Sequence, residues 1–276
     1  MKTLFTILLC AGLSAGAAMT EQVRDKVSHT FGRDTTLDVD NVNGMIEVIG
    51  DGGSAIRLEG ERIIRADTKD EAERAKKEVT LDLNEKNGVA QVYVNGPFRG
   101  HGTDSHGFHE HDNDDRHYQH YQVIYNLTLH VPRETALEIR SVTGGIRVSG
   151  TRGKFSIRTV NGSVNASGID GQGEIRTVNG AVTVAFTSTP EGSTSFEAVN
   201  GKIDVTLPAD LKAELHLRTV NGSAFTDFDA VAPAGSRIDL GRRAGHSADL
   251  KVGGGGVALD FKTVNGGITI HKGGAK

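Results

Sequence analysis

Histidine and acidic residues are concentrated in one segment, residues 96–120 (GPFRGHGTDSHGFHEHDNDDRHYQH). Neutral imidazoles close to carboxylates are typical ligands of Zn²⁺, Cu²⁺ or Ni²⁺. The segment is therefore a candidate metal site, although a solvated loop, or a cluster that becomes charged near about pH 6, would have the same composition. Six of the eleven histidines of the chain make up this candidate: His101, His106, His109, His111, His117 and His120.

Basic residues recur at the position directly before a repeated tetrapeptide whose sequence is close to Thr-Val-Asn-Gly. If the repeats stack, these residues form a stripe on an outer face, where like charges at strand spacing repel one another. Such a stripe could bind an anionic polymer, for example an acidic polysaccharide or lipopolysaccharide. Glu197 interrupts the series, and the alternative is a solvated charged face. The candidate stripe for an anionic ligand is Arg140, Arg158, Arg176, Arg218 and Lys262.

Catalytic motifs are missing from the sequence. No serine lies in a G-x-S-x-G elbow, and no acidic pair stands in the frame of a glycoside hydrolase. The glycines at 253–256 are not followed by the Lys-Ser/Thr of a phosphate-binding loop. The formal net charge of −4 argues against a nucleic-acid-binding protein. The sequence therefore predicts a non-catalytic protein.

The tetrapeptide itself is close to Thr-Val-Asn-Gly, and the sequence on either side of it alternates between apolar and polar residues. Alternation at period two with β-branched residues predicts strands. From Gly144 onward its glycines are 18, 18, 21, 21 and 44 residues apart, and the last interval predicts one degenerate unit near 240–245. The predicted Asn-Gly turns are Asn43-Gly44, Asn161-Gly162, Asn179-Gly180, Asn200-Gly201, Asn221-Gly222 and Asn265-Gly266.

Two architectures use Asn-Gly, because both residues tolerate a positive φ. In a hairpin meander it is a type I′ turn between antiparallel strands. In a β-solenoid it is a corner, and each unit of about 20 residues is one coil with three short sides. Stacked coils would also align identical residues into an asparagine ladder. Glycine makes up 36 of the 276 residues, against the usual ~7%, so the chain turns often and sharply. We favour the solenoid, because stacking rewards the in-register recurrence of whole units.

The part before the repeats is also rich in β-structure but contains one helix. Residues 68–78 (TKDEAERAKKE) contain neither proline nor glycine, with Thr68 as the N-cap and Glu71 placed for a capping box. A hairpin is predicted over 79–94, with its turn at Asn87-Gly88. The predicted fold class is therefore all-β, a β-solenoid-like stack of 18–22-residue repeats after an N-terminal β-rich part with one short helix.

The repeats resemble the bacterial putative-adhesin family of domains of unknown function (DUF4097-like), which is marked by recurring T-V-N-G segments. The stretch Leu129-His130-Val131-Pro132 resembles that family's entry into its repeats, and the glycines at 253–256 resemble its usual ending. The resemblance implies the fold and a role in adhesion, and it brings no catalytic residues. We expect one domain over 18–276, with N-terminal strands, helix and insert up to 131 and repeats over 132–276.

The first residues have the order of a secretory signal peptide. A lysine at position 2 precedes an apolar run over 4–18 that is too short for a membrane span, and Ala15-Gly16-Ala17 fits the cleavage site. We therefore expect a signal peptide over 1–17 and export to the periplasm or surface of a bacterium. The expected role is an adhesin or scaffold that binds envelope polysaccharide or another envelope protein; the alternative is a periplasmic metal-capturing or sensing module that uses the histidine-rich insert. Unpaired strand edges at the terminal coils also offer a route to self-association.

Overall fold

A computed structural model describes residues 6–7, 21–32, 36–99, 120–233 and 246–273. The expected signal peptide, apart from residues 6–7, lies outside the described residues. So do residues 100–119 of the histidine-rich insert and the degenerate unit expected near 240–245.

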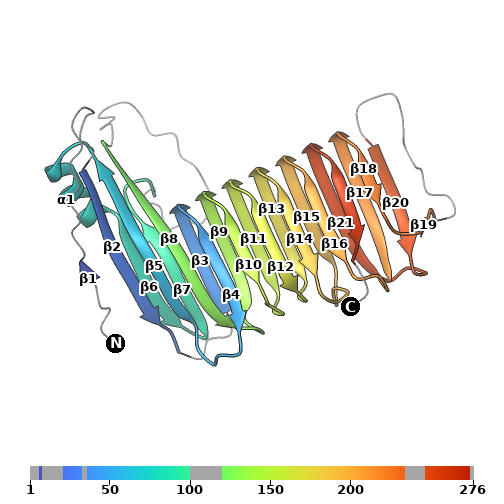
Figure 1. Cartoon of the computed structure of the whole chain (residues 1–276), viewed down its shortest axis with the longest axis horizontal. Coiled ribbons are helices and arrows are strands. Elements are labelled where there is room, and N and C mark those ends of the chain that lie inside the picture. Colours follow the sequence, from blue (N-terminus) through green and yellow to red (C-terminus); the bar gives the residue numbers. More distant parts are fainter. Residues whose placement is uncertain (1–5, 8–20, 33–35, 100–119, 234–245, 274–276) are drawn as a thin grey trace.

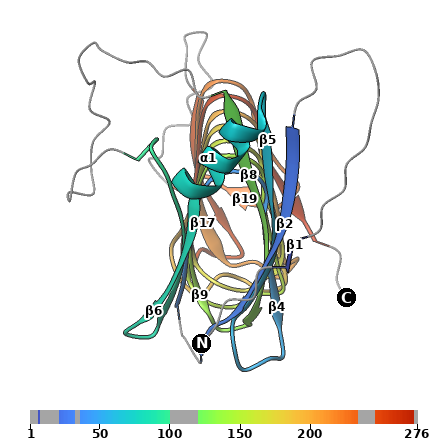
Figure 2. The same cartoon turned by 90° about the vertical axis from the view of Figure 1, so that its left-hand side faces the viewer.

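Two eleven-stranded sheets, here called A and B, face each other along the whole length of the molecule (Figures 1 and 2). Each repeat is one coil, with a strand in sheet B, a short corner and a strand in sheet A. The coils, in chain order, are β3 (Thr36–Asn43) with β4 (Ile46–Asp51), β9 (Ala136–Thr143) with β10 (Ile146–Ser149), β11 (Phe155–Asn161) with β12 (Val164–Ile169), β13 (Gly173–Asn179) with β14 (Val182–Phe186), β15 (Thr194–Asn200) with β16 (Ile203–Leu207), β17 (Ala213–Asn221) with β18 (Ala224–Thr226), and β21 (Val257–Asn265) with β22 (Ile268–Lys272). The predicted β-solenoid-like, all-β fold is confirmed.

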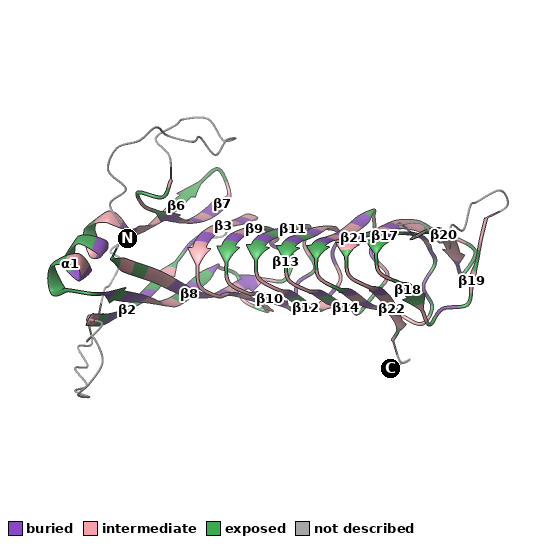
Figure 3. Cartoon of the chain, turned by 90° about the horizontal axis from the view of Figure 1, so that it is seen from above, coloured by how far each residue is buried: buried purple, intermediate pink, exposed green. Residues whose placement is uncertain are grey.

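The described coils have two sides rather than the three that we expected from their length. Buried and more exposed positions alternate along both strands of a coil, so each strand turns one apolar face toward the other sheet (Figure 3). Ile157 of sheet B and Val164 of sheet A are both almost fully buried in this shared core. Because two half-buried strands already close the core between them, the coil does not need a third side.

The corner between the two sheets is built by close contact of glycines in successive coils. A Cβ atom on Gly162 would lie 1.9 Å from the carbonyl oxygen of Gly144, and one on Gly201 would lie 1.8 Å from that of Gly180. Our explanation from positive φ is therefore wrong for most corners. No described corner asparagine has a positive φ, and among the corner glycines only Gly44 (117°), Gly144 (139°) and Gly180 (159°) do. Contact with the neighbouring coil is what requires glycine there.

Asparagine and threonine connect successive corners through their side chains. The asparagine ladder that stacking implies is present: Nδ2 of Asn179 donates to Oδ1 of Asn161 (2.8 Å), and Nδ2 of Asn200 donates to Oδ1 of Asn179 (2.9 Å). The inward-facing hydroxyl of Thr177 donates to the carbonyl oxygen of Gly162 (2.9 Å). Three letters of the Thr-Val-Asn-Gly motif therefore have a structural role at the corner.

Coils do not stack strictly in the order of the sequence. In sheet B the order is β15–β21–β17–β20, so the last coil of the sequence lies between the two coils that precede it. The long interval before the last motif is occupied in part by β19 (Ala230–Val231) and β20 (His246–Val252), and β20 runs antiparallel to β17. Those described parts of the interval form an edge of sheet B rather than a further coil.

The N-terminal part extends both sheets and closes their end. Sheet A continues through β8 (Tyr121–Pro132), β5 (Arg57–Ala66), β2 (Glu21–Thr30) and β1 (Thr6–Ile7), and sheet B continues through β7 (Val89–Asn95) and β6 (Thr80–Lys86). The predicted hairpin over 79–94 is present, with φ of 55° at Asn87 and 76° at Gly88.

The predicted helix is confirmed as α1 (Lys69–Glu78), which lies across this end of the molecule (Figure 2). Oγ1 of Thr68 accepts a hydrogen bond from the backbone N–H of Glu71 (3.2 Å), so Thr68 is the N-cap. The helix buries Ala72 and Ala75 against an apolar cluster from β2 and β5. No helix within the described ranges is long and apolar enough to cross a membrane.

Candidate functional site

The outer face of sheet B carries a line of partly exposed valines, one from each of five coils. Val142, Val160, Val178, Val199 and Val220 are each between 39% and 43% exposed. Each comes from the second position of the repeated tetrapeptide. The register of the strands places the first four side by side, whereas β21 separates Val199 from Val220. We call these five residues the valine row. The threonine of the motif is buried and the asparagine is also exposed, but among the described positions of the motif only the valine places an apolar side chain in solvent.

The basic residues of the expected stripe stand on the same face, two positions earlier in each strand. Arg140 lies opposite Arg158, which lies opposite Arg176. Beyond them the series continues as Glu197, Lys262 and Arg218, because β21 lies between β15 and β17. The structure therefore brings all five predicted residues onto one line. We call Arg140, Arg158, Arg176, Lys262 and Arg218 the basic row.

Carboxylates hold the middle of the basic row in place. Glu174 forms ion pairs with Arg158 and with Nε of Arg176 (3.2 Å), and Nε of Arg176 is 3.6 Å from Oε2 of Glu197. Partial burial opposes ionisation of Glu174. The hydrogen bonds from Arg158 and Ser156 and the positive charges of Arg158 and Arg176 outweigh that effect and lower the pKa of Glu174.

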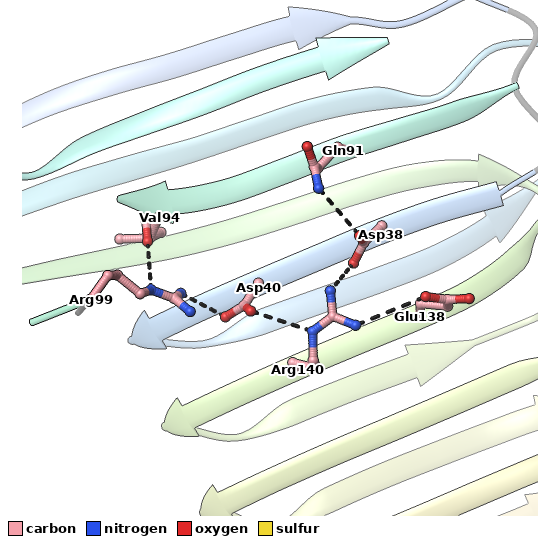
Figure 4. Close-up of polar contacts among 7 residues, drawn as sticks. All are labelled: Asp38, Asp40, Gln91, Val94, Arg99, Glu138 and Arg140. Atoms are coloured by element: carbon pink, nitrogen blue, oxygen red, sulfur yellow. Dashed lines mark hydrogen bonds and ion pairs between the residues drawn. The ribbon is translucent and has the colours of Figure 1, made fainter. Parts of the chain in front are cut away.

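The first member of the row is paired with the coil before it (Figure 4). Arg140 donates to Oδ1 of Asp38 (2.6 Å) and to Oδ2 of Asp40 (3.3 Å). Arg99, which follows β7, donates to the other oxygen of Asp40 (2.7 Å), and its guanidinium lies 4.4 Å from the centre of the Tyr93 ring. A continuous chain of ion pairs thus runs from Arg99 to Arg140.

These ion pairs change what the row can do. Repulsion between neighbouring arginines is offset by the acidic side chains between them, and their guanidinium groups are held against the sheet. Lys262 and Arg218 form no ion pair with any residue that the structure describes. An anionic ligand at Arg140, Arg158 or Arg176 would therefore have to compete with a carboxylate of this chain.

A shallow groove of about 470 Å³ runs over β9, β11, β13 and β15. Four members of the valine row, Val142, Val160, Val178 and Val199, form its apolar floor, and Arg99, Arg140, Arg158 and Arg176 line its side. The groove thus combines apolar contact with positively charged hydrogen-bond donors. Such a surface suits a partner that lies flat along several coils.

Replacing Glu174 with glutamine tests whether this network stabilises the fold. Because the pKa of Glu174 is lowered from 4.5 in the folded protein, its ionised form adds stability above that pH and loses it as the pH falls through the lowered value. We expect Glu174→Gln to reduce the free energy of unfolding at pH 7 and to have progressively less effect below about pH 4.5. Urea unfolding of both proteins at several pH values measures this. If the difference in the free energy of unfolding between the two proteins does not change with pH, this expectation is contradicted.

The sequence alone missed the valine row and the partners of Arg140. The motif did contain a signal for the valines, since a residue two positions after an outward-facing arginine also faces outward in a strand. Asp38, Asp40 and Arg99 had no such signal, because they come from distant segments that only the fold brings together.

Five of the six predicted metal ligands lie outside the described residues; the exception is His120. Its Nδ1 is 3.3 Å from Oδ2 of Asp67, and both side chains are largely exposed. Within the described ranges, no group of three or more histidines, cysteines or carboxylates is arranged to hold a metal ion. Binding of Zn²⁺, Cu²⁺ or Ni²⁺ by the insert therefore stays a prediction.

The two-sheet solenoid with a tetrapeptide corner places the chain in a class of repeat-built β-proteins. The chain belongs to the Toastrack DUF4097 family, whose model matches residues 127–271, just over half of its length. This confirms the resemblance drawn from the sequence. No curated protein matches the chain.

Solved structures with a similar arrangement share little sequence with this chain. One is a putative cell adhesion protein from Clostridium sporogenes ATCC 15579, with 10% identity and a TM-score of 0.45, covering 92% of this chain and 100% of that one. Another is a putative adhesin from Bacteroides fragilis NCTC 9343, with 10% identity and a TM-score of 0.39, covering 90% and 96% of the two chains.

Proposed function

We propose that this protein is an exported, non-catalytic adhesin or scaffold of the bacterial envelope, and that it recognises its partner through the outer face of sheet B. The observation that carries the proposal is the groove of about 470 Å³ in which four members of the valine row lie beside three arginines of the basic row. Export is supported by the signal-peptide pattern of the first residues.

The valines support a binding role because the corner does not require them to be apolar. Threonine side chains at three corners, the asparagine ladder and the corner glycines connect neighbouring coils, whereas valine leaves about two fifths of its surface in solvent. An apolar line with a charged rim is typical of an interaction site. Covering the exposed part of each valine would contribute about 1 kcal/mol to binding.

The spacing of the face indicates an extended partner. Equivalent side chains in neighbouring coils are separated by about 4.8 Å, the distance between strands of a sheet. A polysaccharide or an extended segment of another envelope protein could lie along the groove and meet a valine and an arginine in each of three successive coils. Carboxylates of an acidic polysaccharide could replace Glu174 beside Arg158 and Arg176, which are about half exposed.

Retention on immobilised polygalacturonate and binding to purified bacterial envelopes test the proposal. We expect Arg158→Glu/Arg176→Glu to abolish retention, because two of the four guanidinium groups that line the groove are lost and two negative charges replace them. Val160→Thr/Val178→Thr keeps the β-branched shape and removes apolar surface, so binding should weaken by about three- to tenfold.

A matched control lies on the outer face of sheet A, where Asn165 and Thr183 occupy exposed positions in adjacent strands. The double variant Asn165→Glu/Thr183→Glu adds two negative charges without touching the groove, and it should bind as the wild type does. The proposal fails if the two groove variants bind normally, or if the control loses binding equally.

A further inference from the structure

The C-terminal coil, β21 with β22, is inserted into the stack instead of ending it (Figure 1). In sheet B β21 pairs in parallel with β15 on one side and with β17 on the other. In sheet A β22 pairs in the same way with β16 and β18. The coils from β9 to β16, in contrast, pair with their neighbours in sequence.

The preceding coil is attached to the rest of the stack through this inserted coil. In the described part of the chain, β17 pairs with β21 and β20, and β18 pairs with β22 alone. The asparagine ladder follows the same path, because Asn265 donates to Asn200 (2.7 Å) and accepts from Asn221 (2.8 Å). Removing the coil would leave two parallel strand edges facing an empty position in each sheet.

Four consecutive glycines connect β20 to the inserted coil. Since β20 and β21 lie on opposite sides of β17, this connection crosses the start of β17. A Cβ atom on Gly253 would lie 2.4 Å from the carbonyl oxygen of Leu211, and one on Gly256 would lie 2.3 Å from that of Lys212. Gly254 and Gly255 have φ values near +90°. Glycine alone fits this connection, and the conformational freedom of glycine would also allow the connection to extend and act as a hinge.

We propose that the C-terminal coil, residues 257–272, is exchanged between two copies of this chain, so that each copy fills the open position of the other. The position recognises a coil with a Thr-Val-Asn-Gly corner, and the coil of a second copy offers identical groups. Phe261 would again stack on Phe196, and the asparagine ladder would again be continuous. Exchange changes only the hinge, and such swapping is a low-cost route to a dimer.

An engineered disulfide distinguishes the two arrangements. Ser195 and Asp260 are direct neighbours in β15 and β21, and both lie on the outer face. The test variant carries Ser195→Cys and Asp260→Cys in a chain whose only native cysteine is removed (Cys10→Ser). This variant is unfolded, refolded at low and at high protein concentration, and then oxidised. A coil in its own chain gives a cross-linked monomer, whereas an exchanged coil gives a covalent dimer.

The matched control joins two coils that do not exchange. Glu174 and Ser195 are direct neighbours in β13 and β15, so Glu174→Cys/Ser195→Cys should give cross-linked monomer at every concentration. We expect the test pair to give a covalent dimer whose fraction rises with the concentration during refolding. If the test pair gives cross-linked monomer alone throughout, or if the control gives dimer equally, the proposal is overturned.

A second pair keeps the test decisive if the first variant fails to fold. In sheet A, Asp204 and Thr269 are direct neighbours across the same junction, and Thr183 and Asp204 provide the control. The same gel readout applies. This proposal does not rest on the binding role of sheet B, so either one can fail alone.

Discussion

Replacing Gly266 with alanine is expected to lower the free energy of unfolding by about 3 kcal/mol. The new Cβ atom would lie 2.1 Å from the carbonyl oxygen of Gly201 in the neighbouring coil. That backbone cannot move away easily, because the N–H of Gly201 donates to the carbonyl oxygen of Asn265 (3.0 Å). Relief of the clash therefore requires the two coils to separate.

The adjacent Gly267 provides the control for this experiment. A Cβ atom there would meet the carbonyl oxygen of Ser223 at 3.4 Å, close to ordinary van der Waals contact. We expect Gly267→Ala to change stability by less than about 1 kcal/mol. Urea unfolding followed by circular dichroism measures both variants. Equal stabilities of Gly266→Ala and Gly267→Ala would show that close contact is not what requires glycine at the corner.

The second large effect is expected in the core between β15 and β21. Phe196 is fully buried, stacks on Phe261 at 5.1 Å between ring centres, and meets Phe186 edge-on at 6.1 Å. Phe196→Ala removes these contacts and leaves a cavity, so we expect a loss of about 3–5 kcal/mol.

Phe225 serves as the comparison, because its side chain is 66% exposed. Phe225→Ala should change stability by less than about 0.5 kcal/mol. Thermal and urea unfolding of both variants test the expectation, and the double variant with Phe261→Ala measures the coupling of the two rings. A loss for Phe196→Ala no larger than that for Phe225→Ala would rule out a tightly packed core at this junction.

Much of the fold could be predicted from the sequence because its determinants are local. The repeated motif, the alternation around it and the N-cap at Thr68 each act within a few residues, and they led to the coils and the helix. The order of the coils could not be predicted in this way. Every corner carries nearly the same four residues, so β15 can pair as well with β21 as with β17, and sequence distance does not decide between them.

The site was predictable to the extent that it follows the repeat. Equal positions in stacked coils must align, which is why the basic row was foreseen from its spacing. Its electrostatics were not foreseen, because Asp38 and Asp40 reach Arg140 from a coil that lies a hundred residues earlier in the chain. The asparagine ladder was foreseen from stacking, whereas the positive φ expected at the corner asparagines is not what places them there.

The two edges of the solenoid differ in how much change they can tolerate. At the glycine edge, every described corner is equally short, as at 144–145 and 201–202. At the opposite edge, the connections vary from 170–172 to 187–193, and the chain also leaves for its N-terminal part there, after β4. Among the seven described coils, differences in length are therefore confined to one edge. An inserted epitope or a grafted domain should be accepted within 187–193, whereas the same insertion at a glycine corner would separate the coils.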